Sequence, residues 1–202
     1  MDNIILIGSG GNTRSCIDVI ESTGKYKIVG IVEKNGVDFE DNLEYPVIGI
    51  DDDLENIRSK YSIALICVGQ IKSAEIRVKL YQKLKKLNFK LPTIISPRSH
   101  VSYSSKIGKG TIIMHDVLIN ANVNIGNNCI INNKSLIEHD SFIGDHSHIS
   151  TGAIINGGVN IGSETFIGSG VITKEYISVG DNCVIGAGTL IKNDIESNKL
   201  IK

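Results

Sequence analysis

The sequence has no tryptophan, only three prolines and few aromatic residues, and its charges cancel. With 21 basic against 22 acidic residues, it lacks the one-signed excess that would attract nucleic acid or an anionic membrane surface. No apolar run approaches the roughly 20 residues that a membrane span needs. Met1 to Ile5 lack the basic start of a signal peptide and lead directly into a strand. We therefore expect a cytoplasmic protein without a membrane span.

Cysteine is also scarce. The four cysteines, Cys16, Cys67, Cys129 and Cys183, include no C-x-x-C pair. Buried packing in a reduced protein is the better interpretation than disulfides or a metal site. None of them is placed as a catalytic nucleophile.

What the sequence has instead is a repeat of six residues. An aliphatic residue occupies every sixth position from Val101 to Ile191, and only Thr173 interrupts the series. Four positions later comes a mostly small side chain, as at Ser105 and Ala153. No helix or ordinary strand has this period, but a hexapeptide-repeat parallel β-helix does. The spacing predicts stacked coils that bury a continuous aliphatic ladder.

A longer period lies within the short one. Ile-Gly or Val-Gly pairs recur every 18 residues, which is three hexapeptides. This spacing predicts triangular coils of three short strands, about five of them between residues 101 and 191. We expect these glycines to mark one corner, where they would adopt positive φ. The pairs are Ile107-Gly108, Ile125-Gly126, Ile143-Gly144, Ile161-Gly162 and Val179-Gly180.

Residues 1–95 lack this period and alternate strand and helix patterns. Buried-strand runs at 4–7, 28–32 and 63–68 are separated by segments with helical spacing of apolar residues. The alternation predicts a small, open, parallel, Rossmann-like sheet. The prolines at 92 and 97 mark the joint. We therefore expect an α/β domain over 1–95 and a β-helix domain over 96–202.

The first strand ends in a glycine turn, Gly8-Ser9-Gly10-Gly11. A strand, a glycine turn and a helix can present backbone N–H groups to a phosphate, so Gly8, Gly10, Gly11 and Asn12 are candidate substrate ligands. Glu33 and Lys34 end the second strand and Gly69 the third, so they would line the same crevice. Thr13 replaces the third glycine of a dinucleotide fingerprint. A tight turn without a ligand remains the alternative.

Four of the five histidines lie between His115 and His148. His139 is followed by Asp140, and a carboxylate beside a histidine suits general-base catalysis. His139 and His148 are nine residues apart, half a coil, so in one chain they would lie on different sides. The alternative is that all are solvent-facing corner residues. A zinc site at His146 and His148 lacks further ligands at suitable spacing, so we expect no metal.

The Ile-Gly ladder, the Gly-Ser-Gly-Gly turn, Glu138-His139-Asp140 and His146-Ser147-His148 together resemble the left-handed β-helix sugar acetyltransferases. Within them the chain is similar to the branch of sialic acid O-acetyltransferases and nucleotide-linked 4-amino-sugar N-acetyltransferases. The left hand is implied by this resemblance alone, since the crossover rule favours the right hand.

The resemblance implies a homotrimer with active sites between neighbouring β-helices and acetyl-CoA as the acetyl donor. His139 matches the general base and Asp140 the acid that orients it. His148 matches a residue that meets the acetyl carbonyl from the neighbouring chain. Gly157, Ser169 and Ala187 would lie along the pantetheine arm, and the N-terminal sheet would hold the nucleotide sugar.

The resemblance implies N-acetylation in bacterial glycan biosynthesis, because the N-acetylating members carry a histidine–acid pair and a second histidine nine residues later, as His139, Asp140 and His148 do here. O-acetylation of sialic acid or another nonulosonic acid is the alternative. A trimeric scaffold or sensor would need no His-Asp pair, and serine acetyltransferase-like chemistry fits the N-terminal sheet poorly. Two departures from the resemblance concern ligands: Asn12-Thr13 replace a Gly-His step after the glycines, and no Gly-x-Pro-Ala-Lys tail follows the last coil.

Overall fold

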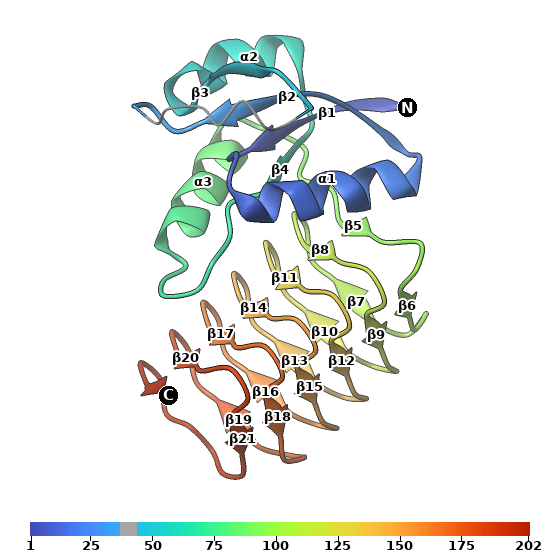
Figure 1. The fold of residues 1–202 in the computed structure, drawn as a ribbon, viewed down its shortest axis with the longest axis vertical. Helices are drawn as coiled ribbons and strands as arrows, with labels where there is room; N and C mark the ends of the chain where they lie inside the picture. The colour runs from blue at the N-terminus through green and yellow to red at the C-terminus, as the bar shows by residue number, and fades with distance from the viewer. Residues whose placement is uncertain (37–43) are drawn as a thin grey trace. The chain divides into compact units, whose positions relative to one another are not determined.

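The computed structural model describes residues 1–36 and 44–202, which form two compact units (Figure 1). One unit comprises Met1–Gly69 and Ile76–Pro92, and the other comprises Gln70–Glu75 and Thr93–Lys202. Most of the second unit thus begins at Thr93, and the short earlier segment Gln70–Glu75 also belongs to this unit. No helix in the described part of the chain is long and apolar enough to cross a membrane.

The N-terminal unit is built on a parallel sheet of four strands in the order β3-β2-β1-β4. The order follows from crossovers that run first to one side of β1 and then to the other. The elements are β1 (Asp2–Ile7), α1 (Gly11–Thr23), β2 (Tyr26–Glu33), β3 (Val47–Ile50), the short 3₁₀ turn η1 (Asp51–Asp53), α2 (Leu54–Lys60), β4 (Ala64–Ile66) and α3 (Glu75–Lys86).

Helices cover both faces of this sheet. Ile5 and Ile7 of β1 share one apolar cluster with Leu54 of α2 and Leu84 of α3. Ile4 and Leu6, which point to the other face, are fully buried, and the apolar residues of α1 are also buried. The doubly covered sheet explains why its strands are continuously apolar rather than alternating.

The second unit is a parallel β-helix whose strands are two residues long (Figure 1). They form sheets of seven, six and five strands, which are the three sides of a triangular coil. The seven-stranded sheet holds β5 (Ile94–Ile95), β8 (Ile112–Ile113), β11 (Ile130–Ile131), β14 (His148–Ile149), β17 (Phe166–Ile167), β20 (Val184–Ile185) and β22 (Leu200–Ile201). The six-stranded sheet holds β6 (His100–Val101), β9 (Leu118–Ile119), β12 (Leu136–Ile137), β15 (Ile154–Ile155), β18 (Ile172–Thr173) and β21 (Leu190–Ile191). The five-stranded sheet holds β7 (Lys106–Ile107), β10 (Asn124–Ile125), β13 (Phe142–Ile143), β16 (Asn160–Ile161) and β19 (Ser178–Val179).

The aliphatic ladder forms the interior of the β-helix, as the period of six predicts. Paired strands place Ile125 beside Ile143 and Ile143 beside Ile161, one coil apart. These side chains are at most 4% exposed, so identical residues stack along the axis. Thr173, the exception in the series, is also buried, and its hydroxyl accepts a hydrogen bond from the Asn156 N–H.

The small position of the repeat has a polar function as well as a steric one. The Ser147 hydroxyl donates to the Gly162 carbonyl and accepts from the Thr165 N–H of the next coil. Thr111 makes the same pair of bonds with Gly126 and Cys129. These hydroxyls satisfy backbone groups at the corners, which would otherwise be buried without partners.

The expectation that the Ile-Gly glycines adopt positive φ is wrong. Positive φ falls instead on other corner positions, such as Asn122, Asp140 and Gly158. Gly144 is needed for a different reason: a Cβ there would lie 2.5 Å from the Ser163 backbone nitrogen of the next coil. The glycines therefore permit close stacking of backbones, whereas Asn, Asp and other glycines accept the left-handed conformation.

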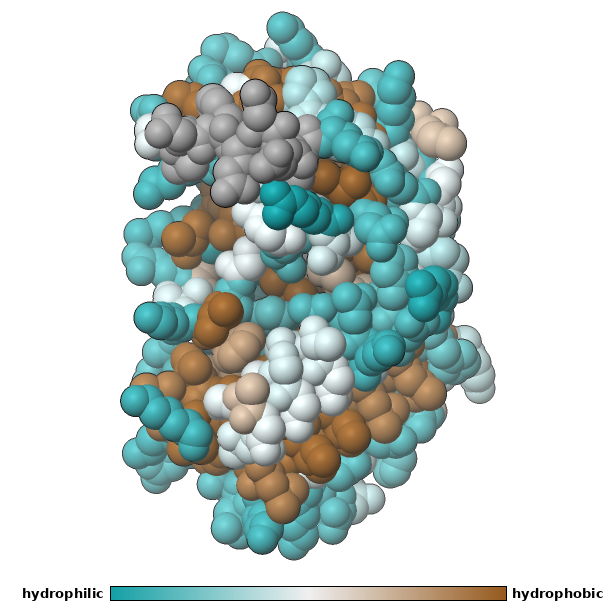
Figure 2. Space-filling model, in the orientation of Figure 1, coloured by the Kyte–Doolittle hydropathy of each residue, from teal (hydrophilic) through white to brown (hydrophobic). Residues whose placement is uncertain are grey.

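The outer face of the six-stranded sheet is aliphatic. Leu118 is 40% exposed, Ile172 41% and Leu190 56%, and Leu136 and Ile154 occupy the intervening coils. Figure 2 shows apolar residues gathered over the coils on the face toward the viewer. The outer face of the five-stranded sheet, with Asn124, Asn160 and Ser178 at the corresponding positions, is mostly polar.

Candidate active site

His139 and Asp140 occupy the turn between β12 and β13, at the corner that joins the six-stranded and five-stranded sheets. We call this the dyad corner; it comprises residues 121–122, 139–140, 157–158 and 175–176 of successive coils. The His139 Nδ1 lies 2.8 Å from Asp140 Oδ2. Because a carboxylate can only accept, Nδ1 carries the proton and Nε2 of the neutral ring is left as the base. The structure thus brings the two predicted catalytic residues together.

Asp140 is held by the coil before it. Its Oδ1 accepts a hydrogen bond of 3.2 Å from the Asn122 amide, and its backbone adopts φ 60°. The hydrogen bond from His139, followed in size by that from Asn122, lowers the pKa of the Asp140 carboxyl below its ordinary value. Asp140 therefore stays ionised and can both orient the imidazole and stabilise its protonated form.

Glu138 contributes a second carboxylate, which contacts the backbone of His139. Its Oε2 accepts from the Asn120 amide at 2.7 Å and from the His139 backbone N–H at 3.3 Å. Neither asparagine was a candidate in the sequence. Both lie 18 residues before their partners, so the coil period itself is the signal that could have found them.

Gly157 lies directly against the His139 ring. A Cβ added there would lie 2.8 Å from Nε2 and 2.9 Å from Cε1. Its lack of a side chain therefore leaves the space that the imidazole occupies. Gly157 and His139 share the dyad corner, one coil apart.

Ser169 and Ala187 lie at a different corner, in the turns that join the seven-stranded and six-stranded sheets. The Ser169 hydroxyl lies 3.0 Å from that of Ser150 in the preceding coil. Within one chain, therefore, Ser169 and Ala187 do not lie at the same corner as His139 and Asp140.

His148 is buried on the outer face of the seven-stranded sheet and does not meet His139 within the chain. Its Nδ1 lies 2.7 Å from the Gln70 carbonyl oxygen, which can only accept, so Nδ1 carries the proton. Its Nε2 lies 3.4 Å from the Asn132 amide nitrogen, and its ring packs edge-on against Phe166 at 5.2 Å. The ring is thus fixed in one tautomer and one orientation.

Gln70 was not a candidate in the sequence. It is 3% exposed, and neither atom of its side-chain amide has a hydrogen-bond partner among residues 1–36 and 44–202. Its backbone carbonyl holds His148 across 78 residues of sequence. No periodicity relates the two positions, so only the fold reveals the contact.

The glycine turn lies where the parallel strands of the N-terminal sheet end. Gly8 adopts φ 100°, and its N–H donates to the Val32 carbonyl. A Cβ at Gly8 would lie 2.6 Å from the Val68 side chain, whereas Gly10 and Gly11 border open space. Gly10 is the N-cap of α1 and makes no side-chain cap bond. This edge of the sheet exposes backbone N–H groups at a helix start, as a phosphate site requires.

Asn12 has a structural partner. Its amide donates to the Cys67 carbonyl at 2.9 Å, which ties α1 to the end of β4, and a Cβ at Gly69 would touch its Cβ at 3.5 Å. Thr13, at the third position of the dinucleotide fingerprint, donates to the Gly8 carbonyl at 2.8 Å. Both side chains thus brace the turn.

Glu33 ends β2 and is 8% exposed. Its Oε1 accepts from the Lys34 N–H at 2.7 Å, while its Oε2 is buried and has no hydrogen-bond partner in the described part of the chain. Lys34 itself is exposed. A buried carboxylate oxygen without a partner is costly unless a ligand or water supplies a donor.

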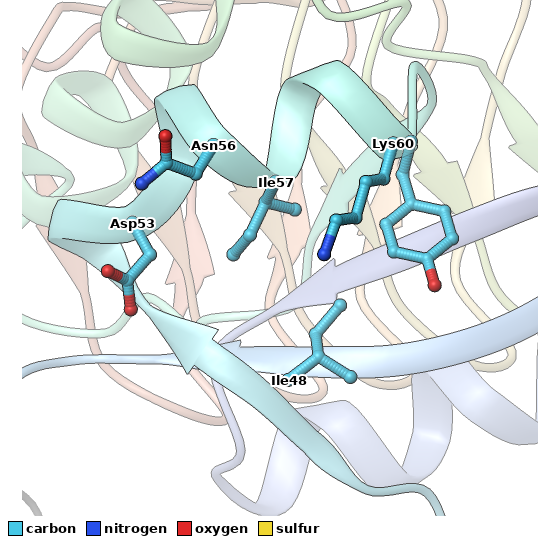
Figure 3. Close-up of a pocket in the computed structure, with 6 residues that line it drawn as sticks. Ile48, Asp53, Asn56, Ile57 and Lys60 are labelled. Atoms are coloured by element: carbon cyan, nitrogen blue, oxygen red, sulfur yellow. The ribbon is translucent and has the colours of Figure 1, made fainter.

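The N-terminal unit also contains a separate cleft of about 420 Å³ (Figure 3). Ile48 of β3 forms one side, and Asp53 and residues of α2 form the other. Asp53 already accepts the Ile50 N–H at 3.0 Å. None of the lining residues is among the candidates predicted from the sequence; they are Ile48, Asp53, Asn56, Ile57, Lys60 and Tyr61.

Comparisons with known proteins agree with both halves of the chain. Residues 3–84 match the PglD N-terminal domain, and residues 104–139 match the bacterial transferase hexapeptide family of six repeats. Comparison with curated protein sequences gives no match.

Solved structures match nearly the whole chain. The acetyltransferase domain of PglB from Neisseria gonorrhoeae FA1090 is 29% identical with a TM-score of 0.89, over 99% of this chain and 96% of that one. PerB from Caulobacter crescentus, in complex with CoA and GDP-perosamine, is 28% identical with a TM-score of 0.92, over 99% of this chain and 93% of that one. WeeI from Acinetobacter baumannii AYE, at 19% identity and a TM-score of 0.85 over 100% of this chain and 97% of that one, shares the fold.

These matches confirm the fold class predicted from the sequence, a small parallel α/β sheet followed by a left-handed parallel β-helix. They also agree with the resemblance carried by the Ile-Gly ladder and the glycine turn. The chain is therefore similar, over nearly its whole length, to hexapeptide-repeat sugar acetyltransferases, and its N-terminal residues match the PglD N-terminal domain.

Proposed function

We propose that the protein transfers the acetyl group of acetyl-CoA to the amino group of a nucleotide-linked 4-amino-dideoxy sugar in bacterial glycan biosynthesis. The observation that carries this proposal is the His139 Nδ1–Asp140 Oδ2 hydrogen bond of 2.8 Å at an open corner of the β-helix. A scaffold would have no need of such a pair. The relatives support the choice of ligands, since PerB is described in complex with CoA and GDP-perosamine.

His139 acts as the general base. As the sugar amine attacks the thioester carbonyl, Nε2 accepts a proton from the amine, and Asp140 stabilises the resulting imidazolium. The C–S bond then breaks, and the imidazolium returns its proton to the departing thiolate of CoA. A thioester is already activated, so no covalent intermediate with a cysteine is needed, which agrees with four buried cysteines.

The charge that develops on the carbonyl oxygen needs a hydrogen-bond donor. Neutral His148 carries its proton on Nδ1 and leaves none on Nε2. His148 can therefore donate from Nε2 only as imidazolium, and a backbone N–H is the other donor available. Such a donor is worth about 3–4 kcal/mol in acyl transfer.

The active protein is a homotrimer with one site between each pair of neighbouring β-helices. Gly157 lies at the dyad corner, whereas Ser169, Ala187 and His148 lie elsewhere on the coil. An acetyl-CoA molecule that contacts both sets therefore needs residues from two chains. The aliphatic outer face of the six-stranded sheet offers the apolar surface for such an interface.

The nucleotide sugar binds at the edge of the N-terminal sheet. The N–H groups near Gly10 and Gly11 receive the diphosphate, and Gly8 keeps the turn close to Val68. Glu33 Oε2 accepts a hydrogen bond from the nucleoside, and Lys34 contributes positive charge near the phosphates. Gly69 lines the same edge. Acetyl-CoA and nucleotide sugars are cytoplasmic metabolites, so we place the reaction in the cytoplasm.

A thiol-release assay with acetyl-CoA tests the proposal. The acceptors are UDP- and GDP-linked 4-amino-4,6-dideoxy sugars, sialic acid and its CMP form, with His139→Ala as the control. We expect turnover on an amino sugar and its loss in the variant. Turnover only on a sialic or related acid would replace N-acetylation by O-acetylation. No turnover and no CoA binding would favour a scaffold.

A further inference from the structure

Tyr176 is an unusual residue at the dyad corner. It occupies the position that Asn122, Asp140 and Gly158 fill in the preceding coils, and like them it has positive φ, at 55°. Asn, Asp and Gly accept this conformation readily, whereas a bulky aromatic residue is an outlier there. Strain of this kind concentrates at functional sites.

The Tyr176 ring lies against the Gly157-Gly158 turn, which the His139 imidazole of the preceding coil also contacts. A Cβ at Gly158 would overlap Cδ1 and Cε1 of Tyr176, just as one at Gly157 would meet the imidazole of His139. The two consecutive glycines therefore make room for two rings, one from the preceding coil and one from the following coil. Two backbone hydrogen bonds of 2.9 Å hold the three coils together at this corner. The Gly158 N–H donates to the His139 carbonyl, and the Tyr176 N–H donates to the Gly157 carbonyl.

The ring stabilises little within the chain. Tyr176 is 73% exposed, and no described residue forms a hydrogen bond with its hydroxyl. A strained, largely exposed aromatic residue contributes less to stability than asparagine would at the same position. Its chemistry, a flat apolar face with a polar tip, suits contact with a ligand.

We propose that Tyr176 is a binding residue for the pantetheine arm of acetyl-CoA, an inference that rests on the proposed function. The arm is a thin chain of methylene and amide groups, so the ring face packs on the methylenes and the hydroxyl donates to an amide carbonyl. Gly157, which the proposed function assigns to acetyl-CoA, lies in the same turn as Gly158, against which the Tyr176 ring packs. This adjacency assigns Tyr176 to the coenzyme rather than to the sugar.

Isothermal titration with CoA, together with thermal melting, tests the assignment. The variants are Tyr176→Asn, which relieves the strain, and Tyr176→Phe, which removes only the hydroxyl. The matched control is Tyr103→Asn, since Tyr103 is fully exposed in a turn at the same corner, two coils before His139.

We expect Tyr176→Asn to raise the Kd for CoA about tenfold while the melting temperature of the free protein rises by about 2–4 °C. Tyr176→Phe should lose a smaller part of the affinity, and Tyr103→Asn none. The KM for the acceptor sugar should stay unchanged in all three. An unchanged Kd in Tyr176→Asn, or an effect confined to the acceptor KM or to the oligomeric state, would overturn the assignment. Absence of CoA binding by the unaltered protein would instead overturn the proposed function.

Discussion

The dyad predicts how single residues should affect catalysis. In the proposed mechanism, His139→Asn removes the base that receives the amine proton and retains the surface proposed to bind CoA. We expect turnover to fall by about 10²–10⁴-fold. Steady-state rates of the unaltered protein and of the His139→Asn variant measure this loss. Titration with CoA should give the same Kd for both proteins. A turnover loss below a few-fold would remove His139 from the mechanism.

Asp140 predicts a pH effect at the same site. Its lowered pKa arises first from His139, so His139→Asn should return the titration midpoint of the Asp140 carboxyl toward its ordinary value. The stabilisation from the His139–Asp140 hydrogen bond is fully present above the ordinary pKa of an aspartate. It is lost as the pH falls through the lowered pKa of Asp140. Carboxyl ¹³C NMR titration of both proteins measures the midpoints. Identical midpoints would show that the hydrogen bond to the ring does not hold the charge.

A substitution at Gly157 should displace the His139 ring without changing the chemistry of the ring. In Gly157→Ala the new methyl group would displace the His139 ring, whose Nε2 lies 2.8 Å from its position. We expect turnover to fall by about 10–100-fold, since small misplacements of a catalytic group are costly. A double-mutant cycle is the check: in a His139→Asn background, Gly157→Ala should add no further loss. Additive losses would show that Gly157 acts independently of His139.

The coils of the β-helix require glycine for two different reasons, close backbone stacking and a positive φ. In Gly144→Ala the methyl group would meet backbone atoms of the next coil, at 2.5 Å from Ser163 N, so the coils must separate. We expect a loss of about 3 kcal/mol in the free energy of unfolding. Gly152→Ala, where φ is 66° and the space is open, should cost about 1 kcal/mol. Urea unfolding of both variants compares them, and a smaller cost at Gly144 would contradict the stacking role.

The β-helix was predictable because each coil repeats one constraint. The period of six places an aliphatic residue at every inward position, and Thr173 fits because its hydroxyl finds a backbone partner. The wrong expectation of a positive φ at Gly108, Gly126 and Gly144 also arises from the repeat. A repeat shows that a small residue is required but does not show whether conformation or space requires it.

The site was only partly predictable, for a physical reason. His139 and Asp140 are adjacent in sequence, so their contact follows from local geometry. Asn122 contacts Asp140 across 18 residues, and the coil period could have revealed it. The Gln70 carbonyl reaches His148 across 78 residues from a segment without a repeat. Contacts of that kind depend on how the chain returns, which no local pattern encodes.

At the scale of the whole molecule, the aliphatic outer face of the six-stranded sheet predicts assembly. Ile172 is 41% exposed there, and a charge at its position would be buried without a partner in a trimer. We expect Ile172→Glu to reduce the assembly to smaller species and to lower turnover. Asn160→Glu, on the polar outer face of the five-stranded sheet, is the control. Light scattering after gel filtration measures the mass, and an intact, active Ile172→Glu trimer would place the interface elsewhere.

The most direct test of the central claim is a comparison of two acceptors that differ at one atom. A nucleotide-linked 4-amino-4,6-dideoxy sugar and its 4-hydroxy counterpart are each incubated with acetyl-CoA, and the products are identified by NMR. The dyad at His139 and Asp140 predicts acetylation of the amine at C4, with little product from the hydroxyl sugar and none with His139→Asn. Equal acetylation of both sugars, or undiminished product with His139→Asn, would contradict it.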